Sequence, residues 1–358
     1  MSNLLITGAA GFVGSNFVHY WHTSNPRDHI VVLDALTYAG NQSNLKGYEN
    51  ASWYKFFKGS ICDQVLIESL LIEHNIDILV HFAAESHVDR SITGPDAFIE
   101  TNIVGTHTLL KAAKKCWLEK DVKDNHLFHH VSTDEVYGSL AEDDMPFSES
   151  TSFAPNSPYA ASKAASDHLV RAYHHTYGLN VTTSNCSNNY GPYHFPEKLI
   201  PLCLVYILKG KPLPIYGDGK QIRDWLFVDD HARGIELILK NGRHGETYNI
   251  GGNNELANID VVNLLCRLVD QRFREDAELA RRFPDSPCAS AISAKSLISF
   301  VKDRPGHDTR YAINADKIAS ELGYQPMEDF ESGLNKTVDW YLANEKWWQS
   351  ILDGSYRS

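Results

Sequence analysis

Short apolar runs rich in β-branched residues alternate with helix-period stretches through roughly the first half of the chain. The strand candidates are residues 4–6, 30–33, 78–82, 127–131 and 181–184. This alternation predicts a doubly wound α/β lobe, in which a parallel sheet has helices on both faces. Because ligands of such sheets bind beyond the carboxyl ends of the strands, the residues that follow each run form the candidate site.

The alternation loosens after about Asn189, where proline and glycine become frequent. A chain of 358 residues with 43% apolar composition is long enough for two lobes that share a cleft. We expect residues 1–188 to form the first lobe, with 226–257 returning to it as a helix and a strand. Residues 189–225 and 258–358 are expected to form a smaller, mixed α/β, substrate-binding lobe.

Charge and cysteine content exclude several classes of protein. Acidic residues outnumber basic ones by 45 to 33, so the surface field repels nucleic acid. The six cysteines and 17 histidines show no metal-ligand spacing, which predicts reduced thiols and no metal site. No signal peptide is recognisable, and the apolar run at 199–208 is too short to span a membrane. We therefore expect a cytoplasmic protein with neither nucleic acid nor a membrane as a partner.

The first apolar run leads into a turn with three glycines, Gly8, Gly11 and Gly14, that opens a helix. Glycines there allow a tight turn and let the backbone approach a pyrophosphate, whose charge is stabilised at a helix N-terminus. The next strand candidate ends at Asp34, whose carboxylate can accept the adenosine ribose hydroxyls and would repel a 2′-phosphate. A structural turn followed by a surface aspartate is the alternative. The combination favours a Rossmann-type domain that binds NAD rather than NADP.

A second constellation, Tyr159 and Lys163, lies in a helical stretch that runs to about Tyr177. A separation of four residues places the phenol and the ammonium group on one helix face. A tyrosine with an unperturbed pKa of about 10 is a weak base near neutrality. The lysine cation, together with oxidised nicotinamide, would favour the phenolate, which could then accept a proton from an alcohol.

Three polar residues, Thr133, Asp134 and Glu135, follow the strand candidate at 127–131. Adjacent carboxylates usually belong to a solvated loop. At the ligand-facing end of a strand they could instead form an acid and base pair with separated pKa values. The residues alone leave both interpretations open.

These motifs occur among further sequence blocks that span nearly the whole chain in order. The blocks are residues 34–41 (DALTYAGN), 81–89 (HFAAESHVD), 132–138 (STDEVYG), 188–192 (NNYGP), 223–225 (RDW) and 303–308 (DRPGHD). Together with the glycine turn and the Tyr159 and Lys163 pair, they resemble the extended short-chain dehydrogenase/reductase family, in its branch of nucleotide-sugar 4,6-dehydratases. Epimerases and decarboxylases of that family share the first and fourth blocks, whereas the third and sixth look specific to dehydratases.

The resemblance implies a bound NAD cofactor and dTDP-glucose as the substrate. The implied reaction oxidises C4, eliminates water across C5 and C6, and returns hydride to C6, which gives a 4-keto-6-deoxy sugar. In this reaction Thr133 orients the 4-hydroxyl, Asp134 is the general acid and Glu135 is the general base. Tyr159 is the oxidising base, and Lys163 holds the nicotinamide ribose.

The resemblance also implies two sets of contacts. Contacts to NAD are implied for Gly8, Gly11, Phe12, Val13, Gly14, Asp34, Leu36, Thr37, Ser60, Ile61, Phe82, Ala83, Ala84, Ser86, Thr101, Tyr159, Lys163 and Asn189. Contacts to the nucleotide sugar are implied for Ser86, Thr133, Asn188, Lys198, Leu199, Pro214, Ile215, Tyr216, Arg223, Asn258, Asp303, Arg304, His307 and Tyr356. The two arginines agree with an independent argument, because a pyrophosphate needs fixed cations and arginine is suited to bidentate phosphate contacts.

Two features depart from the family pattern. Ser60 stands where the family usually has an aspartate that faces the adenine or its ribose, and residues 271–299 look longer than the family norm. A homodimer is expected, for which a helix at 106–117 could serve, although it could equally pack against the sheet. Two other functions stay open: a UDP-sugar 4-epimerase, which needs no carboxylate pair, and a catalytically silent NAD-binding scaffold.

Overall fold

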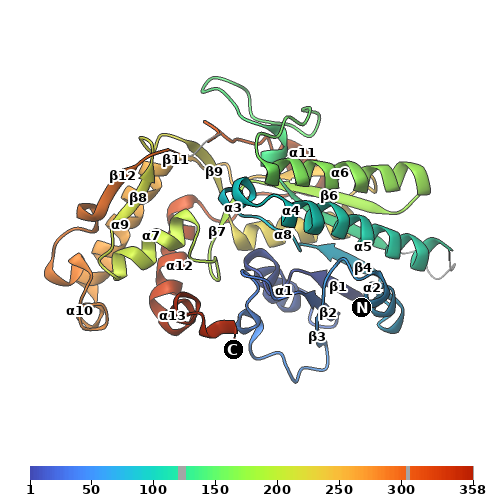
Figure 1. Ribbon diagram of the computed structural model, residues 1–358, viewed down its shortest axis with the longest axis horizontal. Helices are drawn as coiled ribbons and strands as arrows, with labels where there is room; N and C mark the ends of the chain where they lie inside the picture. The colour runs from blue at the N-terminus through green and yellow to red at the C-terminus, as the bar shows by residue number, and fades with distance from the viewer. Residues whose placement is uncertain (120–125, 304–306, 358) are drawn as a thin grey trace.

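The computed structural model describes residues 1–119, 126–303 and 307–357, and its two lobes lie side by side (Figure 1). The strands of the central sheet are β1 (Asn3–Thr7), β2 (His29–Asp34), β3 (Tyr54–Lys58), β4 (Ile78–His81), β5 (Leu127–Thr133), β6 (Val181–Cys186) and β10 (Thr247–Ile250). All pairs are parallel, in the order β10-β6-β5-β4-β1-β2-β3. The doubly wound α/β class is therefore confirmed.

Helices cover both faces of this sheet, because alternate strand residues point to opposite sides. Leu4 and Ile6 of β1 are buried in one core, and Leu5 between them is buried in the other. The first core packs against α1 (Phe12–Ser24), α8 (Val228–Asn241) and α11 (Asp316–Leu322), and the second against α2 (Gln64–Glu73), α5 (Thr106–Ala113) and α6 (Pro158–Tyr177).

The sequence does not predict the edge strand β3, because its run YKFFK has lysines interspersed and only Tyr54 is buried. Of the stretch 226–257 that was expected to return to the first lobe, α8 and β10, which pairs with β6, lie there, whereas β11 (Glu255–Ala257) pairs with β9 (Ile222–Phe227) outside the central sheet. Helix α11 packs there as well, with Ile318 fully buried, so part of 258–358 lies with the first lobe rather than the second. A seven-residue helix does not reveal from sequence which core it joins.

The helix expected at 106–117 comprises α5 and the π-helix η3 (Lys114–Glu119). Its apolar side chains, including Leu109, Leu110 and Trp117, are buried in the core between α5 and the central sheet. The sequence left two roles open for this stretch, a dimer interface or packing against the sheet, and the structure shows packing against the sheet.

The second lobe is built from small sheets and helices around a core of its own. Its strands are β7 (Asn188–Tyr190), β8 (Leu213–Tyr216), β9 (Ile222–Phe227), β11 (Glu255–Ala257) and β12 (Ile298–Val301), and its helices are α7 (Leu199–Leu208), α9 (Asn258–Glu275), α10 (Ala277–Arg282), α12 (Phe330–Ala343) and α13 (Glu345–Asp353). The long stretch 271–299 is part of this core, since Leu279, Phe283 and Ala294 are buried in it. Asp270 anchors the stretch by accepting a hydrogen bond from the Ala294 N–H over 2.8 Å.

The apolar run at 199–208 forms α7, whose side chains are largely buried in this second core. Within the described ranges, no helix combines the length and apolar character needed to cross a bilayer.

Direct hydrogen bonds join the two lobes. Trp347 Nε1 donates to Asn44 Oδ1 over 2.7 Å, and Lys198 Nζ donates to the Ser86 carbonyl over 3.1 Å. These two hydrogen bonds fix the position of the second lobe over the sheet edge.

The remaining short elements are α3 (Val88–Thr93), α4 (Asp96–Phe98), η1 (Gln42–Leu45), the π-helix η2 (Ile99–Gly105), η4 (Asp134–Tyr137), η5 (Pro287–Ser290), η6 (Ala294–Leu297) and η7 (Ser355–Arg357).

Leu334 on α12 is fully buried in the second core, whereas Leu352 on α13 is 45% exposed. Replacing Leu334 with alanine should lower the free energy of unfolding by about 2–5 kcal/mol, because burial is lost and a cavity remains. The control Leu352→Ala should change it by less than about 0.5 kcal/mol. Urea unfolding followed by circular dichroism measures both, and equal effects would contradict this account of the core.

Candidate active site

A cavity of about 570 Å³ lies between the lobes at the carboxyl ends of the central strands. Gly8, Asp34 and Thr133 reach it from the ends of β1, β2 and β5, while Tyr216 and Asn258 line it from the second lobe. The strand order reverses between β1 and β4, and such a switch point is where doubly wound sheets bind their ligands.

The cavity brings together nearly all the residues that the sequence assigned to a site. Its lining includes Gly8, Gly11, Phe12, Val13, Gly14, Asp34, Thr37, Ser60, Ile61, Phe82, Ala83, Ala84, Ser86, Thr101, Thr133, Asp134, Glu135, Tyr159, Lys163, Asn188, Asn189, Lys198, Leu199, Pro214, Ile215, Tyr216, Arg223, Asn258 and His307. Among the described residues, the exceptions are Leu36, Asp303 and Tyr356. Arg304 lies outside the described residues.

These three exceptions contact residues of the lining instead. Asp303 Oδ1 lies 2.7 Å from His307 Nδ1, and the Tyr356 hydroxyl donates to the Tyr38 carbonyl. The Leu36 N–H donates to Asp34 Oδ1 over 2.8 Å, in a backbone turn with φ of 52°. In this structure they therefore support the cavity wall rather than form it.

The glycine turn is packed so closely against its own backbone that two of its positions leave no space for a side chain. A Cβ atom at Gly8 would lie 2.6 Å from Ala83 Cα, and one at Gly14 would lie 2.6 Å from the Gly8 carbonyl oxygen. Gly8 also has φ of +72°, which side chains other than glycine rarely adopt. Helix α1 starts directly after this turn, and its N-cap residue, Gly11, makes no side-chain hydrogen bond to the first turn. The turn therefore fits the pyrophosphate of a dinucleotide.

Asp34 is fixed at the end of β2 by the backbone. Its Oδ2 accepts the Ala10 N–H over 2.9 Å, and its Oδ1 accepts the Leu36 N–H. Burial raises the pKa of Asp34, and these two hydrogen bonds oppose the change. Both oxygens retain lone pairs for ribose hydroxyls. Ser60, where the family has an aspartate, also lines the cavity, and its Oγ accepts the Cys62 N–H over 3.1 Å.

The paired carboxylates are set by the transition from β5 into the 3₁₀ helix η4. Thr133 caps this helix, because its Oγ1 accepts the Glu135 N–H over 3.3 Å. Asp134 is 1% exposed, and among the described residues its Oδ2 has no hydrogen-bond partner. Burial, followed by the charge of Glu135, raises the pKa of Asp134 well above its usual value. The site therefore favours a neutral Asp134, and the solvated-loop interpretation does not fit it.

Tyr159 lies in the first turn of α6, where the Ser157 side chain accepts the Ala160 N–H over 3.0 Å and caps the helix. Burial, and then the charge of Glu135, raises the pKa of Tyr159 well above its usual value. Phenolate formation in this site therefore needs positive charge beside the hydroxyl. Lys163 lines the same cavity one turn later, with its Nζ donating to the Val131 carbonyl over 2.9 Å.

A fixed guanidinium group marks the end of the cavity in the second lobe. Arg223 is 5% exposed and donates to the carbonyls of Ile222 and Asp308 over 2.7 and 3.0 Å. Its Cζ lies 4.3 Å from the centre of the Tyr311 ring. The cation is thus positioned before a phosphate arrives, which reduces the entropy lost on binding.

Sequence reasoning missed several lining residues, among them Tyr311, His194, Trp225 and His231. The His194 ring stacks on Phe12 with centroids 4.1 Å apart, and His231 Nδ1 lies 2.9 Å from Asn189 Oδ1. These contacts join segments far apart in the chain. The only sequence signal was the proximity of Trp225 to Arg223 in the RDW block.

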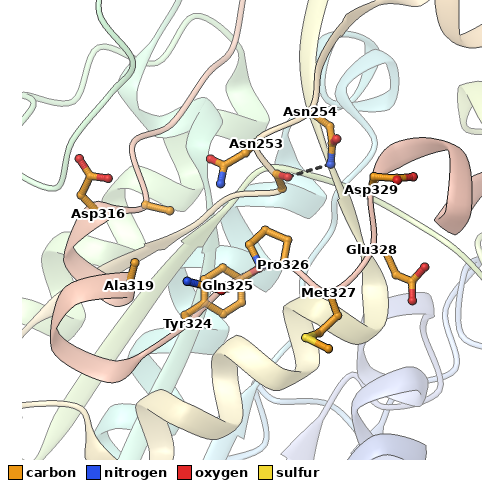
Figure 2. Close-up of a pocket in the computed structure, with 12 residues that line it drawn as sticks. Asn253, Asn254, Asp316, Ala319, Tyr324, Gln325, Pro326, Met327, Glu328 and Asp329 are labelled. Carbon is orange, nitrogen blue, oxygen red and sulfur yellow. Dashed lines mark hydrogen bonds between the residues drawn. The ribbon is translucent and has the colours of Figure 1, made fainter.

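A second hollow on the surface shares none of these lining residues, and Figure 2 shows the side chains around it. Its acidic groups are engaged: Glu328 accepts from Ser332 Oγ, and Asp329 accepts the Ser332 N–H at the start of α12. The dashed bond in Figure 2 joins Asn254 Nδ2 to the Gly252 carbonyl. The described residues contain no cluster of three potential metal ligands, here or elsewhere. We assign no site to this hollow.

Known dehydratases match this chain over most or all of its length. A family model described as GDP-mannose 4,6 dehydratase matches residues 5–337. A dTDP-glucose 4,6-dehydratase from Xanthomonas campestris pv. campestris is 56% identical over 360 residues, which cover 100% of this chain and 98% of the relative.

Two solved structures show the same agreement in three dimensions. The dTDP-glucose 4,6-dehydratase of Bacillus anthracis, in complex with NAD, has a TM-score of 0.84 at 44% identity and covers 98% of this chain and 100% of its own. The dTDP-glucose 4,6-dehydratase of Streptomyces venezuelae, with NAD and TYD bound, has a TM-score of 0.84 at 45% identity, with coverage of 98% and 99%.

The fold and the site define an extended short-chain dehydrogenase/reductase, because a glycine turn, an acidic residue after β2 and the Tyr159 and Lys163 pair share one cavity. The buried carboxylate of Asp134 distinguishes it from a simple dehydrogenase. The chain belongs to the dTDP-glucose 4,6-dehydratase family.

Asp34→Arg should weaken NAD binding and strengthen NADP binding, because a cation replaces the carboxylate that faces the adenosine ribose. Calorimetric titration of each cofactor measures the change. Glu73→Arg, at the exposed end of α2 and outside the cavity, makes the same charge change and should leave both affinities unaltered. Unchanged NAD affinity in Asp34→Arg would place the ribose elsewhere.

Proposed function

We propose that this chain is an NAD-dependent enzyme that converts dTDP-glucose to dTDP-4-dehydro-6-deoxy-glucose. The observation that supports this most strongly is the buried Asp134 beside Glu135 in the cavity that also holds Tyr159 and Lys163. Relatives with this activity in their names match the chain over its full length, and two structural relatives contain NAD.

The cofactor site is assigned to the first lobe. The glycine turn and the N-terminus of α1 would hold the pyrophosphate, Asp34 would accept from the adenosine ribose, and Lys163 would donate to the nicotinamide ribose, since all of them line the cavity. NAD bound there would supply the hydride acceptor for oxidation at C4 and the hydride donor for reduction at C6.

The chain's own residues move the protons. Thr133 orients the 4-hydroxyl, and Tyr159 accepts its proton while C4 becomes a ketone. That ketone acidifies the C5 proton, which Glu135 removes and returns to C5 when hydride is added at C6. Asp134 protonates the C6 hydroxyl, which leaves as water, so it must be neutral at the start. Its burial and the adjacent charge of Glu135 supply this condition.

The nucleotide end of the substrate is assigned to the second lobe. The fixed Arg223 would bind the pyrophosphate, and His307 and Lys198 also line the cavity. Asn188 Oδ1 lines the cavity and is buried without a hydrogen-bond partner among the described residues, so it is available to a sugar hydroxyl or the base.

Two other functions are weaker. A UDP-sugar 4-epimerase needs Tyr159, Lys163 and NAD, but it gives no reason to bury a carboxylate such as Asp134 at the reacting end. A catalytically silent NAD-binding scaffold needs none of these side chains in one cavity.

One experiment separates the three functions. The protein is mixed with dTDP-glucose, and the base-induced absorbance of a 4-keto sugar is followed together with the cofactor spectrum. A dehydratase gives the keto product without net consumption of NAD. Conversion to a 4-epimer, or no conversion, would contradict the proposal, and cofactor reduction in proportion to product would indicate a simple sugar dehydrogenase.

Glu135→Gln should abolish exchange of the C5 hydrogen with deuterated solvent, because the base for C5 is lost while Tyr159 and Lys163 remain. Asp134→Asn should retain that exchange but lose turnover on the order of 100-fold, because the general acid for C6 departure is lost. Mass spectrometry of recovered substrate and product measures exchange and turnover together.

The two variants are controls for each other, since both exchange a carboxylate for an amide of the same size at adjacent positions. Normal C5 exchange and turnover in Glu135→Gln would show that Glu135 is a loop residue without a role in elimination.

We also propose a cytoplasmic homodimer. The described structure contains no disulfide among its six cysteines, as expected in a reducing compartment. Ile92 on α3, and Ile99 and Val104 on η2, are 39–48% exposed, and both elements pack against α6. We propose that these exposed side chains form the dimer interface. Ile99→Glu should therefore lower the molecular mass measured by sedimentation, whereas Ile72→Glu, on α2, should not. A monomeric parent protein would contradict the proposal.

A further inference from the structure

Buried polar groups that do not line the cavity lie next to the Lys163 side chain. Its Nζ lies 3.4 Å from His130 Nε2, and the same ring nitrogen lies 3.1 Å from Asp167 Oδ1. Lys163, His130 and Asp167 are each at most 6% exposed. The ammonium group and the carboxylate therefore lie beside the same imidazole nitrogen, which cannot accept from one and donate to the other at once, and Asp167 Oδ1 has no hydrogen-bond partner among the described residues.

Asp167 follows Lys163 by one turn of α6, and it also contacts the central sheet. Ser132 Oγ donates to Asp167 Oδ2 over 2.9 Å, and Ser132 directly precedes Thr133 at the end of β5. The carboxylate thus joins the helix that carries Tyr159 and Lys163 to the strand that carries the acid and base pair.

A buried ammonium group without a counterion is unfavourable, because it loses its hydration and gains little in return. Asp134 and Glu135 line the reacting side of the cavity, whereas Asp167 lies on the side away from it. Burial lowers the pKa of Lys163 to about 8, and the charge of Asp167 opposes this. Burial raises the pKa of Asp167 to about 7, and the charge of Lys163 and the Ser132 hydrogen bond oppose that.

We propose that Asp167 is a positioning residue for Lys163: from the other side of the His130 nitrogen that both groups approach, the negative charge of its carboxylate holds the buried ammonium group charged and in place. Asp167 touches neither cofactor nor substrate and acts only through the lysine. This inference rests on the proposed function, in which the Lys163 cation binds the nicotinamide ribose and stabilises the phenolate of Tyr159.

Other titratable groups surround the lysine and do not replace Asp167. Burial and the Lys163 charge keep His130 neutral by lowering its pKa, and His81 on β4 is neutral for similar reasons. Burial raises the pKa of Cys186 on β6 to about 12, so its thiol is uncharged. On α6, burial raises the pKa of Tyr159, so its phenol ionises only when positive charge is added beside it, and His168 opposes the raised pKa of Asp167. Asp167 is the acidic group among them that can ionise near neutrality.

Asp167→Asn tests this inference, because an amide can still accept from Ser132 but has no charge. Below about pH 7 the wild-type carboxylate is largely protonated, so variant and wild type should behave alike. Above that pH only the wild type gains the negative charge, and the variant's lysine loses its proton at lower pH. We expect the ratio of variant to wild-type kcat to fall about fivefold between about pH 6 and pH 8, as it would if the lysine's pKa fell by about one.

The affinity for NAD, measured by calorimetry over the same pH range, is a second readout that needs no turnover. It should weaken with pH in Asp167→Asn more than in the wild type. If the wild type fails to convert dTDP-glucose, the proposed function is wrong, and this titration still tests the role of Asp167.

Asp230→Asn is the matched control. Its carboxylate is also buried, accepts the Met327 and Glu328 N–H groups over 2.8 and 3.0 Å, and lies outside the cavity lining. A structural defect of this kind should give a ratio that does not vary with pH. The same flat ratio in Asp167→Asn would overturn the inference.

Ser132→Ala covers the case in which Asp167→Asn does not fold. Loss of the Ser132 hydroxyl leaves Asp167 protonated to higher pH, so the NAD affinity should fall with pH in the same direction but by a smaller factor. A pH profile identical to that of the wild type would again contradict the role of Asp167.

Discussion

Parallel strands place all their carboxyl ends at one edge of a sheet, and the chemistry of this protein depends on that constraint. Residues that follow β1, β2 and β5 are far apart in the chain, yet they reach one cavity because those strands share a direction. The helix α6 then places Tyr159 and Lys163 over the same edge. A cofactor and the acid and base pair that we propose can therefore reach one sugar ring without a large movement of the backbone.

Burial of charge is the second condition for function. The same loss of hydration keeps Asp134 neutral as an acid, makes Tyr159 dependent on added positive charge, and weakens the hold of Lys163 on its proton. In water these groups would have ordinary pKa values and could not divide the roles of acid, base and cation between them. The enclosing second lobe, to which we assign the nucleotide, thus also contributes to the catalytic chemistry.

The sequence predicts the parts of this molecule that local patterns determine. Alternating apolar runs identify the inner strands, and the glycine turn with Asp34 indicates the cofactor site that we propose. Residues alone left the Asp134 and Glu135 pair open, because burial is not visible in a two-residue pattern. The strand β3, the place of α11 and the support of Lys163 by Asp167 were missed, since each depends on contacts between distant segments.

The chain passes between the lobes several times: from β6 to β7, from β9 to α8, from β10 to β11, from β12 to α11 and from α11 to α12. The second lobe is consequently built from several separate segments of the chain and cannot be transferred to another protein as one contiguous stretch of gene. Recombination at a single junction would separate Arg223 from its supporting partner Asp308 or α8 from its sheet. Specificity in such a scaffold is expected to diversify by point substitution on the cavity wall rather than by exchange of whole domains.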